Sequence, residues 1–390
     1  MIKRKITEEI RMLAKEFPIV AIMGPRQSGK TTIAKHIFKK YKYVSLEDYD
    51  KRKIAVDDPR GFLKQYDKNV IIDEVQRAPE FFSYLQTHTD KIKTSGSFVL
   101  TGSQNYLLME NITQSLAGRV GLAILFPLSL EELPAENKSN IYEVVFKGFY
   151  PRIFDQKIRP GSFYKTYLNT YLEKDIRLIK NISDYNLFLK FLKLLAGRSG
   201  QILNIQAIAD DVGITNKTVE SWLSILETSF IIYRLQPYHK NYNKRVVKSS
   251  KLFFYDVGLV CYLLGIKKPE ELESYYQFGN LFENFIISDL MKYSYNYGEL
   301  ANFYFWKDGH NNEIDLLIEY GNKIKVIEIK SAQTFREEFL KNVSKFSKLE
   351  KAKKVEQFLL YGGDENLQYK GAKVFSWNSL KDLRKTKIFE

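Results

Sequence analysis

The chain has 390 residues, more than one hydrophobic core usually serves, so we expect roughly two to four domains. Its 44% hydrophobic content excludes a disordered chain, and its single cysteine excludes an intrachain disulfide and a cysteine-based zinc site. The net charge of +14 favours a polyanionic partner such as DNA, although a lysine-rich proteome would give the same charge without one. We expect a cytoplasmic protein without membrane contact, because the basic N-terminus lacks the apolar stretch of a signal peptide and residues 120–130 are too few to span a bilayer.

A glycine-rich loop follows a predicted strand at residues 17–22 and precedes a predicted amphipathic helix. The loop fits the pattern G-x-x-x-x-G-K-[ST], whose backbone N–H groups surround nucleotide phosphates. Lys30 would reach the β- and γ-phosphates, and the Thr31 hydroxyl would bind Mg²⁺. We therefore predict that ATP binds to Gly24, Pro25, Arg26, Gln27, Ser28, Gly29, Lys30, Thr31 and Thr32.

Short apolar strands are also predicted at residues 43–46, 69–73, 98–101 and 120–125. Helical or polar stretches separate them, so we expect an α/β fold with a P-loop NTPase parallel sheet and helices on both faces. The second of these strands ends in Asp73 and Glu74. We predict that Asp73 holds the Mg²⁺ shell and that Glu74 orients and deprotonates the attacking water.

Three further residues are candidates for sensing the γ-phosphate or stabilising its transfer. Ser103 and Asn105 follow a predicted central strand, where ligands of open α/β sheets bind, and either would sense the γ-phosphate. The alternative is an ordinary polar turn. Arg119 would be a catalytic arginine beside the site, or else a surface residue. If Arg119 acted in trans, the protein would have to form a homo-oligomer.

Six segments of the chain carry a resemblance to a known group of proteins. They are residues 24–32, 73–77, 100–105, 115–119, 126–129 and 148–151. In this order they resemble a group of prokaryotic AAA-fold ATPases that carry a C-terminal domain of unknown function. The resemblance implies an ATP-binding core of the class with an extra strand between its two nucleotide motifs.

We assign this AAA-type core to residues 1–134. Apolar residues at helical spacing predict a helical lid at residues 135–185. Residues 171–177 within it resemble the lid signature of the same group, and Arg177 would face the nucleotide or a neighbouring subunit.

Residues 186–262 are predicted to form a winged-helix domain. A capped helix, a turn at Gly213 and a second helix give the helix-turn-helix arrangement, in which the second helix presents polar residues to base edges. A basic, aromatic-rich segment would lie between the two wing strands. The predicted DNA-binding residues are Thr215, Asn216, Lys217, Thr218, Ser221, Lys240, Lys244 and Arg245. Protein docking is the alternative, because Asp211 and Glu220 weaken the basic face.

Residues 263–390 are predicted to form an α/β restriction-endonuclease-like domain. Asp315 interrupts an apolar strand, and Glu328 and Lys330 lie on one face of the next strand. Burial of such charges is costly unless they pair or bind a metal. Helix, strands and D…E-x-K resemble the PD-(D/E)xK nuclease superfamily, which implies a Mg²⁺ site at Glu283, Asp315, Glu328 and Lys330. The acid stands in Glu-Ile-Asp rather than Pro-Asp, and the alternative is a decayed or structural site.

The sequence therefore predicts a Mg²⁺-dependent AAA-type ATPase that acts as a nucleotide-dependent switch on DNA. One alternative is an ATP-gated, Mg²⁺-dependent DNA nuclease. A second alternative is a regulatory or protein-docking module without nuclease activity, for which ATP is only a ligand.

Overall fold

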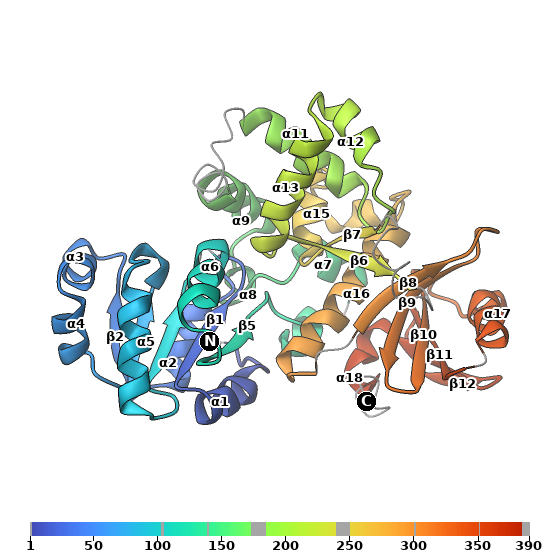
Figure 1. Cartoon of the computed structure of the whole chain (residues 1–390). Coiled ribbons are helices and arrows are strands. Elements are labelled where there is room, and N and C mark those ends of the chain that lie inside the picture. The colour runs from blue at the N-terminus through green and yellow to red at the C-terminus, as the bar shows by residue number, and fades with distance from the viewer. Residues whose placement is uncertain are drawn as a thin grey trace. The chain divides into compact units, whose positions relative to one another are not determined.

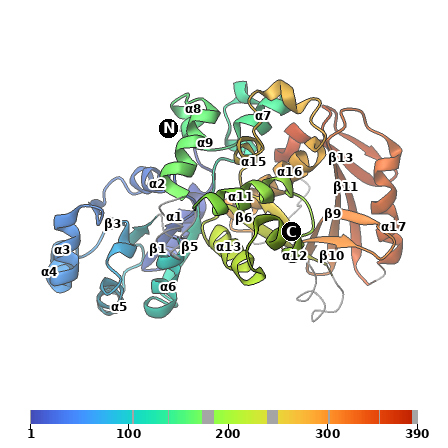
Figure 2. The same ribbon diagram turned by 90° about the horizontal axis from the view of Figure 1, so that it is seen from above.

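The computed structural model describes residues 2–102, 105–138, 140–172, 185–238, 250–299, 302–350 and 352–383. The chain divides into two compact units, whose elements are seen from two sides in Figure 1 and Figure 2. The first unit contains Met1–Pro127 with the short segments Thr228–Phe230 and Tyr295–Gly298, and the second contains the remaining residues. Among the described residues, no helix has the length and apolar character needed to cross a membrane.

A five-stranded parallel sheet forms the centre of the first unit. Its strands are β1 (Ile19–Met23), β2 (Lys42–Ser45), β3 (Val70–Asp73), β4 (Phe98–Thr101) and β5 (Val120–Ile124). Their spatial order is β2-β3-β4-β1-β5, and every pairing is parallel. Strand β4 thus lies between the strand before the phosphate loop and the strand that ends in Asp73. The predicted α/β fold with a parallel sheet is confirmed.

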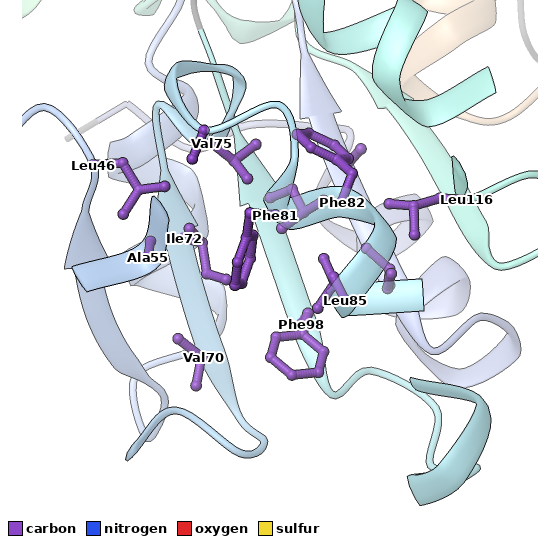
Figure 3. Packing of buried hydrophobic residues seen from close by; sticks show 14 of the residues in the cluster. Leu46, Ala55, Val70, Ile72, Val75, Phe81, Phe82, Leu85, Phe98 and Leu116 are labelled. Atoms are coloured by element: carbon purple, nitrogen blue, oxygen red, sulfur yellow. The ribbon is translucent and has the colours of Figure 1, made fainter. Parts of the chain in front are cut away.

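Helices cover both faces of this sheet, because its strands are apolar on both sides. Alternate residues of β1 point to opposite faces: Val20 and Ile22 pack in one cluster, and Ile19, Ala21 and Met23 in the other. The first face is covered by α1 (Thr7–Glu16) and α2 (Lys30–Ile37). The second is covered by α3 (Tyr49–Asp57), α4 (Pro59–Gln65), α5 (Phe81–Ile92) and α6 (Asn105–Ser115). Figure 3 shows Phe81 and Leu85 of α5 against Phe98 of β4.

Helices make up the first part of the second unit. In chain order they include α7 (Ile141–Lys147), α8 (Pro151–Asp155), α9 (Pro160–Tyr167), α11 (Tyr185–Gly197), α12 (Ile205–Val212), α13 (Asn216–Thr228), α15 (Val257–Leu263) and α16 (Phe278–Asn296). The ring of Trp222 on α13 packs edge-on against Phe188 and Phe191 of α11, at centroid distances of 5.1 and 5.3 Å. The turn between α12 and α13 begins at Gly213, whose φ of 86° suits glycine.

An eight-stranded sheet completes the second unit, in the order β12-β13-β11-β10-β9-β8-β6-β7. The antiparallel hairpin of β6 (Ile232–Pro237) and β7 (Lys251–Phe254) joins it by a parallel pairing of β6 with β8. The other strands are β8 (Asn302–Lys307), β9 (Glu313–Tyr320), β10 (Lys323–Lys330), β11 (Lys354–Tyr361), β12 (Leu367–Tyr369) and β13 (Ala372–Ser376). Helix α17 (Lys341–Leu349) packs on β9 to β11 (Figure 2), and α18 (Leu380–Leu383) follows β13. The hairpin that was predicted as a wing is therefore an extension of the C-terminal sheet.

Asp289 on α16 is a buried carboxylate that makes the second unit sensitive to pH. It accepts a hydrogen bond from the Leu130 N–H at 2.6 Å, and burial raises its pKa from 3.8 to about 6 although Lys292 opposes the shift. Because the folded-state pKa is raised, the contribution of Asp289 to stability is complete below pH 3.8 and is lost as the pH rises through about 6.

Asp289→Asn keeps an oxygen acceptor for Leu130 but does not titrate. In urea unfolding between pH 4 and 7, the stability of the wild type relative to this variant should fall by up to about 3 kcal/mol as the pH rises. Parallel stability curves for the two proteins would contradict the assignment of this pH dependence to Asp289.

Candidate functional site

The phosphate-loop segment takes a backbone shape that side chains at two positions would prevent. Gly24 has a φ of +136°, and a Cβ there would lie 2.1 Å from the carbonyl oxygen of Leu125. Gly29 has a φ of +97° and immediately precedes α2. The loop therefore turns tightly from the end of β1 into the first turn of a helix, where backbone N–H groups and the helix dipole favour an anion.

Lys30 lies inside this loop. Its ammonium donates hydrogen bonds to the carbonyl oxygens of Gly24 and Pro25, both at 2.8 Å, and the residue is buried. The backbone N–H groups of the loop and the Lys30 ammonium therefore lie together at the carboxyl end of β1.

Asp73 joins three hydroxyl groups at this edge of the sheet. Thr31 Oγ1 donates to both of its carboxylate oxygens at 3.2 Å, Tyr43 Oη donates at 3.0 Å, and Thr101 Oγ1 donates to Oδ1. The β3–β4 register places Thr101 directly opposite Asp73. Burial and the Asp73 carboxylate raise the pKa of Tyr43 to about 12. The Thr31 hydroxyl and the Asp73 carboxylate are hard oxygen donors of the kind that Mg²⁺ takes, so the residues fit this ion.

Glu74 follows Asp73 in a conformation that is unusual for its residue type. Its φ of 54° lies in the left-handed region, which costs about 1–3 kcal/mol for a residue with a side chain. The amide of Gln76 donates to Glu74 Oε2 at 2.6 Å, and Gln76 is itself buried. A Cβ at Gly102 would lie 2.3 Å from Gln76 Oε1, so the glycine after β4 leaves room for this side chain. Gln76 is thus a positioning residue for Glu74.

Arg4 is a contact of the loop that the sequence did not reveal. Its guanidinium is buried and donates to the Ser28 carbonyl oxygen at 2.8 Å and to the Phe126 carbonyl oxygen at 2.7 Å. It therefore ties the phosphate loop to the chain that leaves β5. In the sequence Arg4 was only part of a basic N-terminus, and no motif distinguishes it from the lysines on either side.

The other predicted residues of the nucleotide site are not placed there by the described structure. Arg119 precedes β5, and because β5 runs parallel to β1, Val120 pairs with Ile19 at the end of the sheet away from the loop. This puts Arg119 roughly 15 Å from the loop of its own chain, which corrects the expectation that it lies beside the site. Its guanidinium instead pairs with Asp90 at 2.7 and 2.9 Å. Ser103 and the side chain of Asn105 lie outside the described residues.

The position of Arg119 gives a prediction for catalysis. An arginine finger contributes roughly 10³–10⁵-fold to phosphoryl transfer, so its loss is easy to detect. We expect Arg119→Ala to leave ATP turnover unchanged at protein concentrations where sedimentation shows a monomer. A large loss of turnover in the monomer would contradict the placement of Arg119 at the opposite end of the sheet.

In the second unit, three of the four predicted nuclease-like residues, Asp315, Glu328 and Lys330, contact one another, and the fourth, Glu283, pairs with a lysine that was not predicted. Lys330 Nζ lies 2.5 Å from Glu328 Oε1 and 3.8 Å from Asp315 Oδ2. Asp315 Oδ2 also accepts a hydrogen bond from the Ile329 N–H at 2.7 Å. Glu283 pairs with Lys251 Nζ at 2.9 Å, and the same ammonium contacts Glu313. Lys251 and Glu313 were not predicted, because neither belongs to the D…E-x-K pattern.

We call Glu283, Glu313, Asp315 and Glu328 the acidic cluster, and burial is the main cause of the raised pKa of two of its members. Burial raises the pKa of Glu283 to about 8, against the effect of Lys251, and burial with the nearby Asp315 raises that of Glu328 to about 8. Burial alone would lower the pKa of Lys251, but the surrounding carboxylates raise it further than burial lowers it. Among the described residues, no three His, Cys, Asp or Glu side chains are arranged to hold a metal ion.

The exposed start of α13 carries the described part of the predicted DNA-binding surface. Thr215 Oγ1 accepts the Thr218 N–H at 3.2 Å, Asn216 donates to Gln206 at 2.8 Å, and Lys217 is exposed. Arg234 of β6 pairs with Glu220 at 3.0 Å, and Arg198 pairs with Asp211 at 2.5 Å. The two acids expected to weaken a basic face are therefore neutralised. The segment with Lys240, Lys244 and Arg245, like Arg177, lies outside the described residues.

Three parts of the chain match known protein families. Residues 16–134 match the family described as "AAA domain". Residues 138–270 and 278–380 match two families described as domains of unknown function, DUF8612 and DUF4143.

Two relatives that match most of the chain are described as uncharacterized proteins. An uncharacterized protein of Mycobacterium tuberculosis is 26% identical over 339 residues, which cover 85% of this chain and 74% of that protein. An uncharacterized protein of Haemophilus influenzae is 24% identical, covering 80% of this chain and 82% of that protein.

Solved structures with partial likeness include a Walker-type ATPase of Pyrococcus abyssi. It is 14% identical with a TM-score of 0.43, and the match covers 66% of this chain and 94% of that one. AMPPCP-bound DnaA from Aquifex aeolicus is 14% identical with a TM-score of 0.28, covering 57% and 85%. Both scores are below 0.5, so neither likeness supports a conclusion about this chain. Residues 16–134 thus match the AAA domain family, and their parallel sheet with its phosphate loop resembles that of P-loop ATPases.

Proposed function

We propose that this chain hydrolyses ATP with Mg²⁺ and uses the cycle as a switch for events on DNA. The observation that carries the first part is the convergence of Lys30, Thr31 and Asp73 at the carboxyl edge of one parallel sheet. Lys30 and Thr31 begin α2 and Asp73 ends β3, and each has the chemistry that a nucleoside triphosphate requires.

ATP would bind with its phosphates inside the loop. The Lys30 ammonium would exchange the carbonyl oxygens of Gly24 and Pro25 for phosphate oxygens, and the backbone N–H groups before α2 would donate to the same charge. Thr31 and Asp73 would hold the magnesium ion, which neutralises developing negative charge on the phosphates. Thr101, hydrogen-bonded to Asp73, would keep that carboxylate in orientation.

Glu74 would then accept a proton from the attacking water. Gln76 supports this role, because its amide holds one carboxylate oxygen of Glu74 at 2.6 Å and so fixes the other relative to the loop. A change in the helices that follow the core, dependent on the bound nucleotide, would link ATP hydrolysis to the rest of the chain. In a homo-oligomer, an arginine from a second copy of the chain would complete the ATP site.

The role on DNA is supported by the helix-turn-helix surface of the second unit. Helix α13, which would be the recognition helix, begins with exposed polar residues, and Arg234 and Arg198 neutralise the acids nearby. The net charge of +14 is in keeping with phosphate contacts. The deciding experiment is ATP turnover with and without duplex DNA. A higher rate of ATP turnover with DNA would support the switch. The same rate with and without DNA at low salt would contradict it.

Lys217 provides a sharper test of the DNA surface. Lys217→Ala should weaken duplex binding and reduce the salt slope of log affinity by about 1, because one phosphate contact is lost. The matched control is Lys157→Ala, which removes another exposed lysine, outside the predicted helix-turn-helix, and should leave the slope unchanged. Equal slopes for both variants would favour the alternative, a protein-docking role for this surface.

A DNA nuclease gated by ATP is the second candidate function. The proximity of Asp315, Glu328 and Lys330 favours it. Plasmid cutting that requires Mg²⁺ or Mn²⁺ and is lost in Asp315→Ala would support it. An absence of cutting in every nucleotide state would leave the cluster a structural site.

A further inference from the structure

A surface groove runs between helices α4 and α5 of the first unit. Its volume is about 550 Å³, and residues of both helices line it. The two helices are held together by Phe62 of α4 and Phe81 of α5, which pack edge to face at a centroid distance of 5.3 Å. Leu63, which lines the groove, is only 4% exposed. The spacing of the two walls is therefore determined by the hydrophobic core beneath them.

Asp67 and His88 join the two walls of the groove. His88 Nε2 lies 2.9 Å from the Asp67 carbonyl oxygen and 3.1 Å from Asp67 Oδ1. Asp67 follows α4, whereas His88 lies on α5 and packs edge-on against the ring of Phe98 at 5.9 Å. Among the described residues that line the groove, Asp67 is the one carboxylate. The acid of the groove is therefore already in contact with a side chain of the protein.

Three cations line the groove without being neutralised. Arg60 and Lys64 lie one turn apart on α4, and Lys91 lies on α5. Within the described part of the chain, none of these three side chains makes an ion pair or a hydrogen bond. Asp90, the neighbour of Lys91, pairs instead with Arg119 at 2.7 and 2.9 Å. Because a concave surface lined by one sign of charge concentrates ions of the other sign, the groove favours an anionic ligand.

Tyr84 adds an aromatic ring to the same groove. It lies on α5 one turn before His88, and it is 39% exposed. No other aromatic ring of the described residues contacts it. An exposed ring beside several cations is the combination that binds unpaired nucleotides, because a base stacks on the ring while phosphates contact the cations.

We propose that the α4–α5 groove binds a single strand of nucleic acid, with phosphates at Arg60, Lys64 and Lys91 and a base stacked on Tyr84. A volume of about 550 Å³ is typical of sites for small molecules, so the groove accommodates part of an unpaired strand and not a double helix. The proposal goes beyond the proposed switch, because it gives the ATPase unit a contact with nucleic acid of its own. It does not depend on the helix-turn-helix of the second unit or on ATP hydrolysis.

The test is fluorescence anisotropy of a labelled oligothymidylate with the full chain, without nucleotide. Lys64→Ala/Lys91→Ala should weaken binding and reduce the salt slope of log affinity by about 1.4, because each phosphate contact with a single strand contributes about 0.7. Tyr84→Ala should weaken binding by about 5- to 150-fold, the loss expected for one stacked base. Tyr84→Ala should leave duplex binding unchanged, because paired bases are not available to the ring.

Two matched controls keep the charge change and the ring loss outside the groove. Lys39→Ala/Lys40→Ala removes two exposed lysines that follow α2, and Tyr49→Ala removes a ring that is 64% exposed on α3. Both controls should bind the oligothymidylate like wild type. Photo-cross-linking with an oligonucleotide that carries 5-iododeoxyuridine should modify the peptide that contains Tyr84.

The proposal is overturned if the groove variants bind the strand like wild type, if the controls lose as much affinity, or if the cross-link lies outside α4 and α5. Equal losses of strand and duplex binding in Tyr84→Ala would also overturn it. Lys217→Ala should leave oligothymidylate binding unchanged, so a failure of the helix-turn-helix surface and a failure of this groove are distinguishable. ATP turnover with and without duplex DNA tests the proposed function separately.

Discussion

Replacement of Glu74 by glutamine should reduce ATP turnover by about 10²–10⁴-fold, because a positioned general base contributes that much. Glutamine keeps the size of the side chain and a carbonyl oxygen, so the contact with Gln76 and the left-handed backbone are preserved. Nucleotide affinity should stay close to that of wild type, since Lys30 and the loop are unchanged. Phosphate release and equilibrium binding of a fluorescent ATP analogue measure the two effects independently.

Glu47 gives the matched control for this substitution. It follows β2 at the same edge of the sheet, its side chain is 70% exposed, and it makes a 3.3 Å contact with Arg77. Glu47→Gln removes the same charge from the same region and should leave turnover unaltered. If both variants lost the same fraction of ATP turnover, Glu74 would act through its negative charge at this edge of the sheet and not as the general base.

Arg4→Met should destabilise the first unit by roughly 3 kcal/mol, because charged hydrogen bonds to two buried carbonyl oxygens are lost and the acceptors remain. The carbonyls belong to Ser28 in the phosphate loop and to Phe126 after β5. A loop that loses this tie should also bind ATP more weakly. Hydrogen exchange of the amides of α2, with nucleotide titration, measures both consequences.

Arg11→Met is the comparison for Arg4. Arg11 pairs with Glu8 at 2.7 Å on the surface of α1, where the two side chains are 49% and 76% exposed. A solvent-exposed pair contributes less than about 1 kcal/mol, so this variant should exchange like wild type. If the two variants behaved alike, the buried contacts of Arg4 would contribute nothing to the loop.

The sequence predicts those parts of the site that lie within one motif or at the end of one strand. The loop pattern identified Lys30 and Thr31, and the two acids after an apolar strand identified Asp73. Their meeting across 42 residues follows from the parallel sheet, which alternating strands and helices already indicated. Thr101 was within reach of the same reasoning, because it ends the strand that the family resemblance places beside β3.

Residues that act through tertiary register were not predictable in this way. Arg4 reaches Phe126 across 122 residues, and nothing in its local sequence encodes that contact. The prediction for Arg119 was wrong for the opposite reason. Arg119 is close in sequence to the predicted γ-phosphate sensors Ser103 and Asn105, but it precedes β5, and a strand parallel to β1 begins at the end of the sheet away from the loop. Lys251 lay in the predicted winged-helix domain and outside the nuclease-like pattern, and hydrogen bonds between β7 and α16 bring it to Glu283.

The pairing of β6 with β8 also determines where this protein can be divided for study. Gln236 and Pro237 of β6 pair with Tyr304 and Phe305 of β8, so the sheet crosses the boundary at residue 262 that the sequence suggested. A fragment that began after residue 262 would lack β6, so the backbone N–H and C=O groups of β8 that pair with β6 would be exposed. Exposed strand edges of this kind pair with other chains and cause aggregation. A fragment that begins at residue 263 should therefore precipitate, and a soluble fragment must keep strands β6 to β13 together.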